Sequence, residues 1–251
     1  MIIVNEIIEK KKKLIDLLRE KRASIIAKAV TNGLDPKAPL IDSGIPWLGK
    51  IPKGWGVRRV KYVLDLISGH GFPEELQGRI FGDFPFYKVS DINGDRLYLD
   101  SANNFVDKKD VKNNNWKIIP SGSILTAKIG AALSMNHRKI TTVDSIIDNN
   151  MLGFILKSKK YNLLYLYYLS TIIDMGWFVN PGAVPSVNMQ QFKNEFIPEL
   201  PITDQKKIVD FLGLKIQQID DALIKIERSI ELVNEYRTSL ISSAVTGKIQ
   251  L

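Results

Sequence analysis

The 251-residue sequence has no cysteine and only two histidines, and these absences exclude several classes of protein. Without cysteine the chain can form neither disulfides nor thiolate metal sites, which suits a reducing cytosol, so we expect a cytoplasmic protein. His70 and His137 lie far apart and neither belongs to an HExxH pattern, so no zinc site is predicted. We expect no metal and no cofactor.

Long apolar runs and catalytic motifs are missing as well. No stretch approaches the roughly 20 apolar residues of a membrane span, and the segment from Met1 to Glu6 meets charge too early for a signal peptide. The sequence contains neither a base-methylation motif, Asp/Asn-Pro-Pro-Tyr/Phe, nor a glycine-rich cofactor loop. Asp95, Asp107 and Lys109 faintly resemble a nuclease pattern, so a small stand-alone metal-dependent nuclease is the alternative function.

Basic charge is in excess, with 35 Lys and Arg against 27 Asp and Glu and a net charge of +8. Such an excess is compatible with a polyanionic partner such as nucleic acid. The excess is uneven, because residues 201–251 carry seven basic and seven acidic groups. A neutral C-terminal segment is typical of contacts with protein rather than with DNA.

The end of the chain repeats its beginning. Arg22–Thr31 reads RASIIAKAVT and Arg237–Thr246 reads RTSLISSAVT, an offset of 215 positions. In this register, residues 6–31 and 221–246 share ten identities. The offset far exceeds the roughly 20–50 residues of a solenoid repeat. One helical element is therefore used twice, with a large insert between the copies.

The C-terminal copy lies in a long predicted helix between Thr203, the expected N-cap, and Gly247, the expected stop. Its apolar residues alternate spacings of three and four, a heptad seam interrupted by Arg237. Such a helix spans on the order of 60 Å, so a partner helix is expected, and the N-terminal helix, over residues 4–30, supplies one. The seam residues predicted to contact a partner helix are Ile15, Leu18, Ile25, Leu212, Ile216, Ile219, Leu223, Ile226, Ile230, Val233 and Leu240.

The insert between the two helices differs from them in composition and in its hydrophobic pattern. Residues 33–56 are rich in proline and glycine and are expected to form a linker, held to a surface by Trp47 and Trp55. Residues 57–200 mix strand and helix patterns, which predicts an α+β globular domain between two helical arms. Strands are expected at 57–63, 84–89, 123–127 and 151–156, and a buried helix at 163–175, whose tyrosines are expected in the core.

Six stretches, taken in order and flanked by the duplicated helix, resemble the specificity subunits of type I restriction–modification systems. Tyr87-Lys-Val-Ser-Asp-Ile92, for example, resembles a strand of the family's target-recognition domain. Asp204-Gln205 departs from the family's usual Glu-Gln, and one recognition domain is present where members usually hold two. The six stretches are Ser43–Trp55, Tyr87–Ile92, Pro120–Leu125, Asn180–Asn188, Pro198–Ile208 and Ala244–Ile249.

The resemblance implies a non-catalytic subunit whose recognition domain reads one half of a split target in double-stranded DNA. It implies methyltransferase subunits and, through the complex, a restriction subunit as partners. The chain looks like half a subunit, so we expect a homodimer in which each N-terminal helix pairs with a neighbour's long helix. The expected parts are a partial N-terminal helix (1–32), a linker (33–56), the recognition domain (57–200) and the long C-terminal helix (201–251).

Base reading requires Arg, Lys, Asn, Gln or Ser side chains on loops that reach base edges. Polar clusters of this kind follow several predicted strands, although each is open to a second interpretation as an ordinary solvated loop. The lysines at 108–109 and 157–160 have no such neighbours and are interpreted as solvated. The candidate DNA-binding residues are Lys88, Ser90, Lys128, Asn136, His137, Arg138, Lys139, Asn149, Asn180, Asn188 and Gln190.

Overall fold

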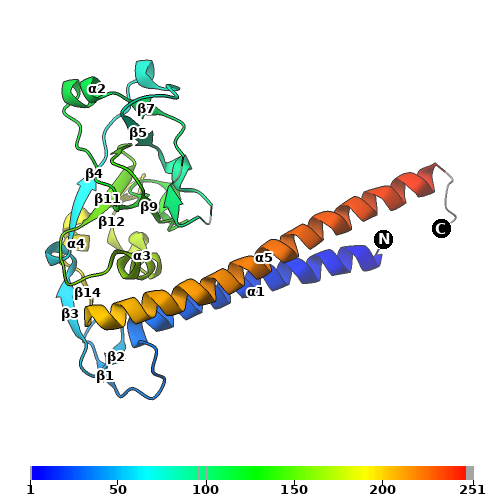
Figure 1. Ribbon diagram of the computed structural model, residues 1–251, viewed down its shortest axis with the longest axis horizontal. Coiled ribbons are helices and arrows are strands. Elements are labelled where there is room, and N and C mark those ends of the chain that lie inside the picture. Colours follow the sequence, from blue (N-terminus) through cyan, green and yellow to red (C-terminus); the bar gives the residue numbers. More distant parts are fainter. Residues whose placement is uncertain (1, 95, 100, 247–251) are drawn as a thin grey trace. The chain divides into compact units, whose positions relative to one another are not determined.

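A computed structural model describes residues 2–94, 96–99 and 101–246. The chain divides into two compact units. The helical unit joins Met1–Ala29 to Val209–Leu251, and the globular unit is Val30–Ile208. Figure 1 shows the long helices of the helical unit and the mixed strands and helices of the globular unit, so the expected α+β class is confirmed.

The two long helices are α1, Ile2–Asn32, and α5, Ile202–Val245. The carbonyl of Pro201 accepts hydrogen bonds from the N–H groups of Asp204 and Gln205, so the first helical turn begins directly after this proline. Thr203, expected as the N-cap, therefore lies inside the helix, whereas Asp204 is in the first turn as expected. Gly247, the expected stop, lies outside the described residues.

In the helical unit, α1 and α5 run antiparallel and share an apolar seam. Ile15 packs with Ile219 and Leu223, all less than 10% exposed, and half-buried seam residues surround them. The partner of α5 in this structure is thus the α1 of the same chain. The other seam residues in this cluster are Leu18, Ile25, Ile226 and Ile230. Before this cluster on α5, Leu212 and Ile216 are buried, and after it Val233 and Leu240 are half-buried.

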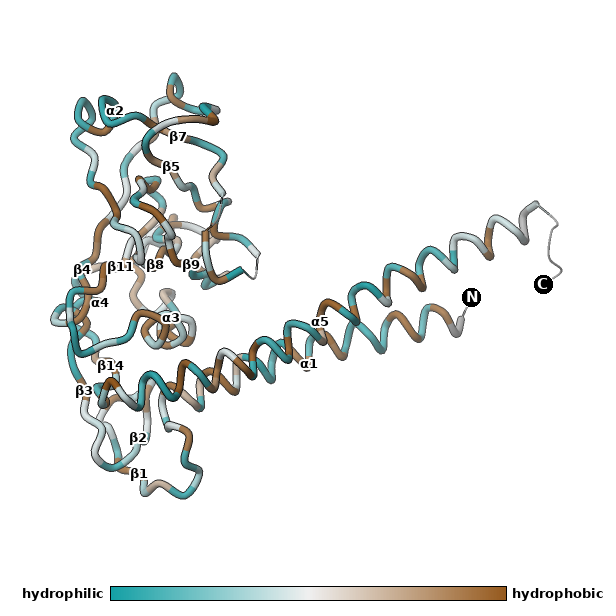
Figure 2. The backbone as a smooth tube through the Cα atoms, viewed as in Figure 1, coloured by the Kyte–Doolittle hydropathy of each residue, from teal (hydrophilic) through white to brown (hydrophobic). Residues whose placement is uncertain are grey.

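Polar contacts across the helix pair follow the sequence repeat. Arg22 Nε lies 3.3 Å from Asp220 Oδ1, and Arg237 Nη1 donates to Asn5 Oδ1 at 3.3 Å. Arg237 is Arg22 shifted by 215 positions, and Asp220 is Asn5 shifted by the same number. The two contacts are therefore equivalent under exchange of the helices, and the pair has local pseudo-two-fold symmetry. Figure 2 shows hydrophobic residues recurring along both helices.

The main sheet of the globular unit has five strands in the order β4-β11-β8-β9-β6. The strands expected at 123–127 and 151–156 are confirmed as β8 and β11, and β8 is buried at every position. The segment 57–63 is not one strand, because a 3₁₀ turn at Val60–Tyr62 separates two strands that join different sheets. The strands are β4 Leu64–Ser68, β6 Tyr98–Leu99, β8 Ile124–Ala127, β9 Lys139–Thr141 and β11 Met151–Leu156.

A second sheet orders β10-β5-β7, with β5 parallel to β10 and antiparallel to β7. Phe86 of β5 is fully buried, stacks on Phe72 at 3.8 Å between ring centroids and meets Trp116 edge-on at 5.4 Å. This aromatic group forms a core separate from the one beneath the main sheet. The elements here are β5 Phe84–Tyr87, β7 Phe105–Val106, α2 Lys108–Asn113 and β10 Ile146–Ile147.

The segment expected as a linker forms a hairpin within the globular unit. Trp47 donates from its indole to Glu195 Oε1 at 3.2 Å, and the Trp55 ring lies against Gly33, so both tryptophans hold this segment to a surface as expected. Two further ribbons, β14-β3 and β12-β13, complete the sheets. Their strands are β1 Leu40–Asp42, β2 Lys50–Pro52, β3 Gly56–Arg59, β12 Val179–Asn180, β13 Ser186–Val187 and β14 Phe196–Glu199.

The predicted buried helix is α3, Leu163–Ile172, and a 3₁₀ helix at Met175–Phe178 follows it. The side chain of Asn162 caps α3 by accepting from the N–H of Tyr165. The tyrosines at 161, 165, 167 and 168 are all less than 10% exposed, which confirms the core assignment. A further α-helix, α4, spans Met189–Asn194. Within the described residues, none of the helices offers an apolar stretch sufficient to cross a bilayer.

Candidate nucleic-acid interface

Several loops that carry predicted DNA-binding residues are joined by backbone hydrogen bonds. The N–H of Lys128 donates to Asn150 O at 2.7 Å, and the carbonyl of Lys128 accepts from Val187 at 3.0 Å. Gly130 donates to Pro185 O at 2.8 Å. The loops after β8, before β11 and between β12 and β13 are thereby held side by side. Because these bonds use backbone groups, side chains of the loops remain available for other contacts.

Two more segments join this group through the parallel strands. Asp148 donates from its backbone to Tyr87 O at 2.9 Å, so the ends of β5 and β10 lie together. A Cβ at Gly69 would fall 2.0 Å from Asp148 O, so only glycine allows this close approach. We call residues 68–70, 87–90, 128–130, 148–150 and 179–188 the polar loop cluster.

Lys128 is the best-defined cation of the cluster. Its Nζ donates to Ser68 Oγ at 2.7 Å from a half-buried position. Burial lowers the pKa of Lys128, and the carboxylate of Asp148 acts in the opposite direction. A partly desolvated ammonium interacts more strongly with an anion than a fully hydrated one, because the local dielectric is lower.

The other residues of the cluster offer mainly amide and hydroxyl groups. Asn149 and Ser90 are exposed, and the Lys88 ammonium donates to Gln77 Oε1 at 2.9 Å and lies 5.0 Å from the centroid of the Phe72 ring. Asn188 Nδ2 donates to Asn180 Oδ1 at 3.0 Å across the β12–β13 ribbon. Gln190 lies just beyond this ribbon, exposed on α4. Amides of this kind can pair with base edges in both directions.

The sequence profile described as the type I restriction modification DNA specificity domain matches residues 52–233. The chain belongs to this family. It is similar, at 22% identity over 210 residues, to the type I restriction enzyme MjaIX specificity subunit of Methanocaldococcus jannaschii, covering 80% of this chain and 46% of that protein. The chain spans about half the length of the curated relatives it matches.

Solved structures show the same fold. A chain from a study of complex assembly and conformational transition in a type I R-M system matches with a TM-score of 0.63 and 16% identity, over 96% of this chain and 56% of that one. The HsdS subunit from Thermoanaerobacter tengcongensis matches with a TM-score of 0.55 and 16% identity, over 98% of this chain and 57% of that one.

In this specificity domain, four consecutive candidates do not belong to the polar loop cluster. Arg138 is 4% exposed, and its guanidinium donates to Thr126 Oγ1 at 2.6 Å and to Asn136 Oδ1 at 2.8 Å. Burial lowers the pKa of Arg138 to about 10. Lys139 is 2% exposed and donates to the carbonyl of Arg96. The prediction that Arg138 and Lys139 contact DNA is therefore wrong for this conformation, because both side chains are buried and donate to neutral acceptors of the same domain.

Asn136 and His137 flank this buried arginine and share its environment. Asn136 adopts a φ of +49° and donates from its side chain to Thr171 O at 3.0 Å. His137 is half-buried, and its backbone carbonyl accepts from Arg138 at 2.9 Å. Sequence alone does not reveal this role, since a buried arginine network and a DNA-reading loop contain the same residue types.

Ser90 lines a polar hollow of about 400 Å³. Most of the other residues that line it were not among the predicted DNA-binding residues. Asn93 and Asn103 line it, and Asn103 Nδ2 donates to Asp91 Oδ1 at 2.7 Å. The density of Asn and Ser between residues 90 and 104 was the available signal. The amide and hydroxyl groups that line this hollow add hydrogen-bonding groups near the polar loop cluster.

Nothing in the geometry supports the nuclease alternative. Asp107 is the N-cap residue of α2 and lies 3.7 Å from Arg79 Nη1, while Asp95 lies outside the described residues. Within the described ranges, no group of three or more His, Asp or Glu side chains could hold a metal ion.

Proposed function

We propose that the chain is a non-catalytic DNA-sequence-recognition subunit of a type I restriction–modification complex. The observation that carries this proposal is the family match over residues 52–233. The globular unit would read one half of a split target in double-stranded DNA through the polar loop cluster. In this role the protein would work in the cytoplasm, where it meets DNA and its partner subunits.

The charge distribution supports DNA approach by the globular unit and protein contacts by the C-terminal segment. Residues 30–208 carry 22 Lys and Arg against 17 Asp and Glu, a net charge of +5 that favours approach to DNA. The neutral segment 201–251 suits contacts with protein. The helical unit would therefore dock methyltransferase subunits and, through the complex, the restriction subunit.

A homodimer would supply the second recognition domain. Leu17 and Leu232, which are equivalent in the repeat, are 60% and 50% exposed, and Ile241 is 43% exposed. These apolar side chains on the outer faces of the helix pair offer a surface for a second copy. A two-fold dimer repeats one recognition domain, so its target would be a palindromic split site.

The oligomeric state tests the dimer directly. Sedimentation equilibrium at micromolar concentration is expected to give a dimer for the wild type and a monomer for Ile241→Asp. Lys225→Asp, which changes an exposed charged residue of the same helix, should remain dimeric. A wild-type monomer in the absence of methyltransferase would contradict the homodimer and leave DNA reading to be tested separately.

DNA reading is tested in two steps. Methylome sequencing of cells carrying the cognate methyltransferase, with and without this chain, defines the target. Binding of the target duplex is then compared for Asn149→Ala and for Asn113→Ala, which changes another exposed asparagine, on α2. Loss of a base contact should weaken specific binding by about 10- to 100-fold for Asn149→Ala, and Asn113→Ala should bind as the wild type does.

Salt dependence separates phosphate contacts from base contacts. Wild-type affinity should fall by orders of magnitude between ~50 and ~200 mM salt. Lys88→Ala should reduce the slope of log K against log salt by about one, while Asn149→Ala leaves the slope unchanged. Flat salt dependence of the wild type would contradict a DNA-reading function.

A further inference from the structure

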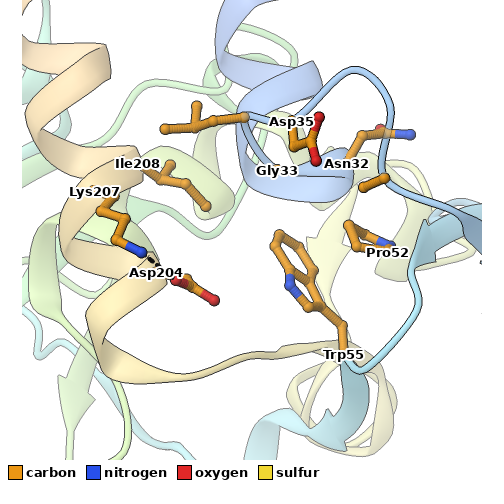
Figure 3. Close-up of a pocket in the computed structure, with 10 residues that line it drawn as sticks. Asn32, Gly33, Asp35, Pro52, Trp55, Asp204, Lys207 and Ile208 are labelled. Carbon is orange, nitrogen blue, oxygen red and sulfur yellow. Dashed lines mark hydrogen bonds and ion pairs between the residues drawn. The ribbon is translucent and has the colours of Figure 1, made fainter.

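A cavity of about 260 Å³ lies where the first turns of α5, the end of α1 and the β1–β2 hairpin meet. All of its walls belong to the globular unit. Figure 3 shows Trp55 standing along one side, with Ile208 and Asp204 across from it. The cavity is smaller than the roughly 300–1,000 Å³ of ordinary ligand sites, so it fits one inserted side chain rather than a cofactor.

The walls of the cavity are largely apolar and firmly placed. Pro52 and Ile208 are buried, and Trp55 is half-buried. Gly33 has a φ of +74°, and a Cβ at this position would lie 3.3 Å from Trp55 Cζ2. Glycine therefore lets the end of α1 turn closely over the indole and fix its position. Figure 3 shows the indole nitrogen on the side of the ring that faces Asp204.

Two carboxylates stand on either side of this apolar space. Asp35 comes from the turn after α1, and its Oδ1 accepts from the N–H of Lys37 at 2.9 Å. Asp204 comes from the first turn of α5 and pairs with Lys207 at 3.1 Å. The Lys207 side chain is 72% exposed, so this ion pair is weak and easily rearranged. The cavity thus has an acidic rim on a chain whose net charge is +8.

We propose that this cavity is a socket for an arginine or lysine side chain of a partner protein. The aliphatic part of the side chain would lie along Pro52 and Ile208, as long basic side chains do on apolar surfaces. Its cationic end would lie against the Trp55 ring, the preferred aromatic partner of cations. Asp35 and Asp204 would then supply charge-assisted hydrogen bonds. The same carboxylates would repel a phosphate, so the socket is a protein contact beyond the proposed DNA reading.

The probe is N-acetyl-arginine amide, titrated into the full chain labelled with 5-fluorotryptophan. The four tryptophans give separate ¹⁹F signals, and Trp55→Phe assigns the relevant one. We expect the Trp55 signal to shift and saturate with millimolar affinity, as suits a single side chain. N-acetyl-norleucine amide, which lacks the charge, and N-acetyl-glutamate amide, which reverses it, should shift the signal little.

Asp35→Asn and Asp42→Asn form a matched pair for this titration. Each aspartate is exposed and accepts one backbone N–H from the residue two positions ahead, but only Asp35 lines the cavity. Asp35→Asn should weaken binding of the arginine probe about fivefold, and Asp42→Asn should leave it unchanged. DNA binding should be unaffected by either change.

Three results would overturn the socket: a Trp55 signal that does not respond to the arginine probe, an equal response to the norleucine probe, or equal affinities for wild type and Asp35→Asn. The signals of Trp47, Trp116 and Trp177 report whether each variant is folded, so a loss of binding is not mistaken for unfolding.

Discussion

The two copies of the repeated segment have six of ten residues in common but partly different surroundings. Ile26 and Ile241 occupy equivalent positions in RASIIAKAVT and RTSLISSAVT. Ile26 is 4% exposed, whereas Ile241 is 43% exposed. Both residues lie in helices, so the difference does not come from local structure. The repeat specifies a helix with an apolar face, and the rest of the fold decides which copy has that face covered.

Aspartate substitutions should separate the two copies most strongly. Ile26→Asp puts a carboxylate in a buried site and should lower the free energy of unfolding by about 3–5 kcal/mol. Ile241→Asp should cost less than about 0.5 kcal/mol when the protein is monomeric. Urea unfolding at a concentration low enough to exclude dimers measures both. Equal losses would mean that the two copies have equivalent surroundings in solution.

The end of the N-terminal copy is also fixed by a specific buried hydrogen bond. Tyr165 is fully buried, and its hydroxyl donates to Val30 O at 2.9 Å. Tyr165→Phe removes the donor and leaves a buried carbonyl unpaired, which should cost about 1–3 kcal/mol. Tyr236→Phe, at a 60% exposed position beside the C-terminal copy, should cost almost nothing. Thermal unfolding of both variants tests the difference, and a neutral Tyr165→Phe would contradict it.

The repeated arginines should differ by a smaller amount. Arg22 forms an ion pair with Asp220, whereas Arg237 donates to the neutral side chain of Asn5. Arg22→Ala should lower the free energy of unfolding by less than about 1 kcal/mol, and the effect should shrink in high salt. The smaller effect of Arg237→Ala should not change with salt. A salt response of the same size in both variants would show that the two contacts are electrostatically alike.

Where the copies have similar surroundings, the effects should also be similar. Leu17 and Leu232 are 60% and 50% exposed. Leu17→Ala and Leu232→Ala should each change the free energy of unfolding by less than about 0.5 kcal/mol in the monomer. Chemical denaturation of the two variants side by side measures this. A large loss for only one of them would show that the pseudo-symmetry of the helix pair fails at this position.

Much of the fold could be predicted because its signals are local. The heptad spacing predicted α5 and its seam, and the strands β5, β8 and β11 fell within a few residues of their predicted bounds. The start of α5 was missed by two residues because the carbonyl of Pro201 accepts its first hydrogen bonds. The hairpin in residues 33–56 was missed because its strands are only three residues long and surrounded by proline and glycine.

The candidate site could be predicted only in part. Residue type identified Lys128 and Asn149 as polar loop residues, and the structure joins their loops through backbone hydrogen bonds. Residue type could not separate them from Arg138, because a buried guanidinium with internal acceptors and an exposed one for DNA look the same in sequence. Two of the acceptors of Arg138, Thr126 Oγ1 and Ile173 O, lie 12 and 35 positions away, beyond any local pattern.

The sequence by itself determined the helices, the seam, the repeat and the balance of charge, because each depends on the spacing of residues along the chain. Only the tertiary structure decided that α1 covers α5, that Ile26 is buried while Ile241 is exposed, and that Trp55 stands between two carboxylates. Burial and charge pairing depend on what distant segments bring to the same place. Two helical segments of similar sequence can therefore share their conformation and still differ in the burial of equivalent residues such as Ile26 and Ile241.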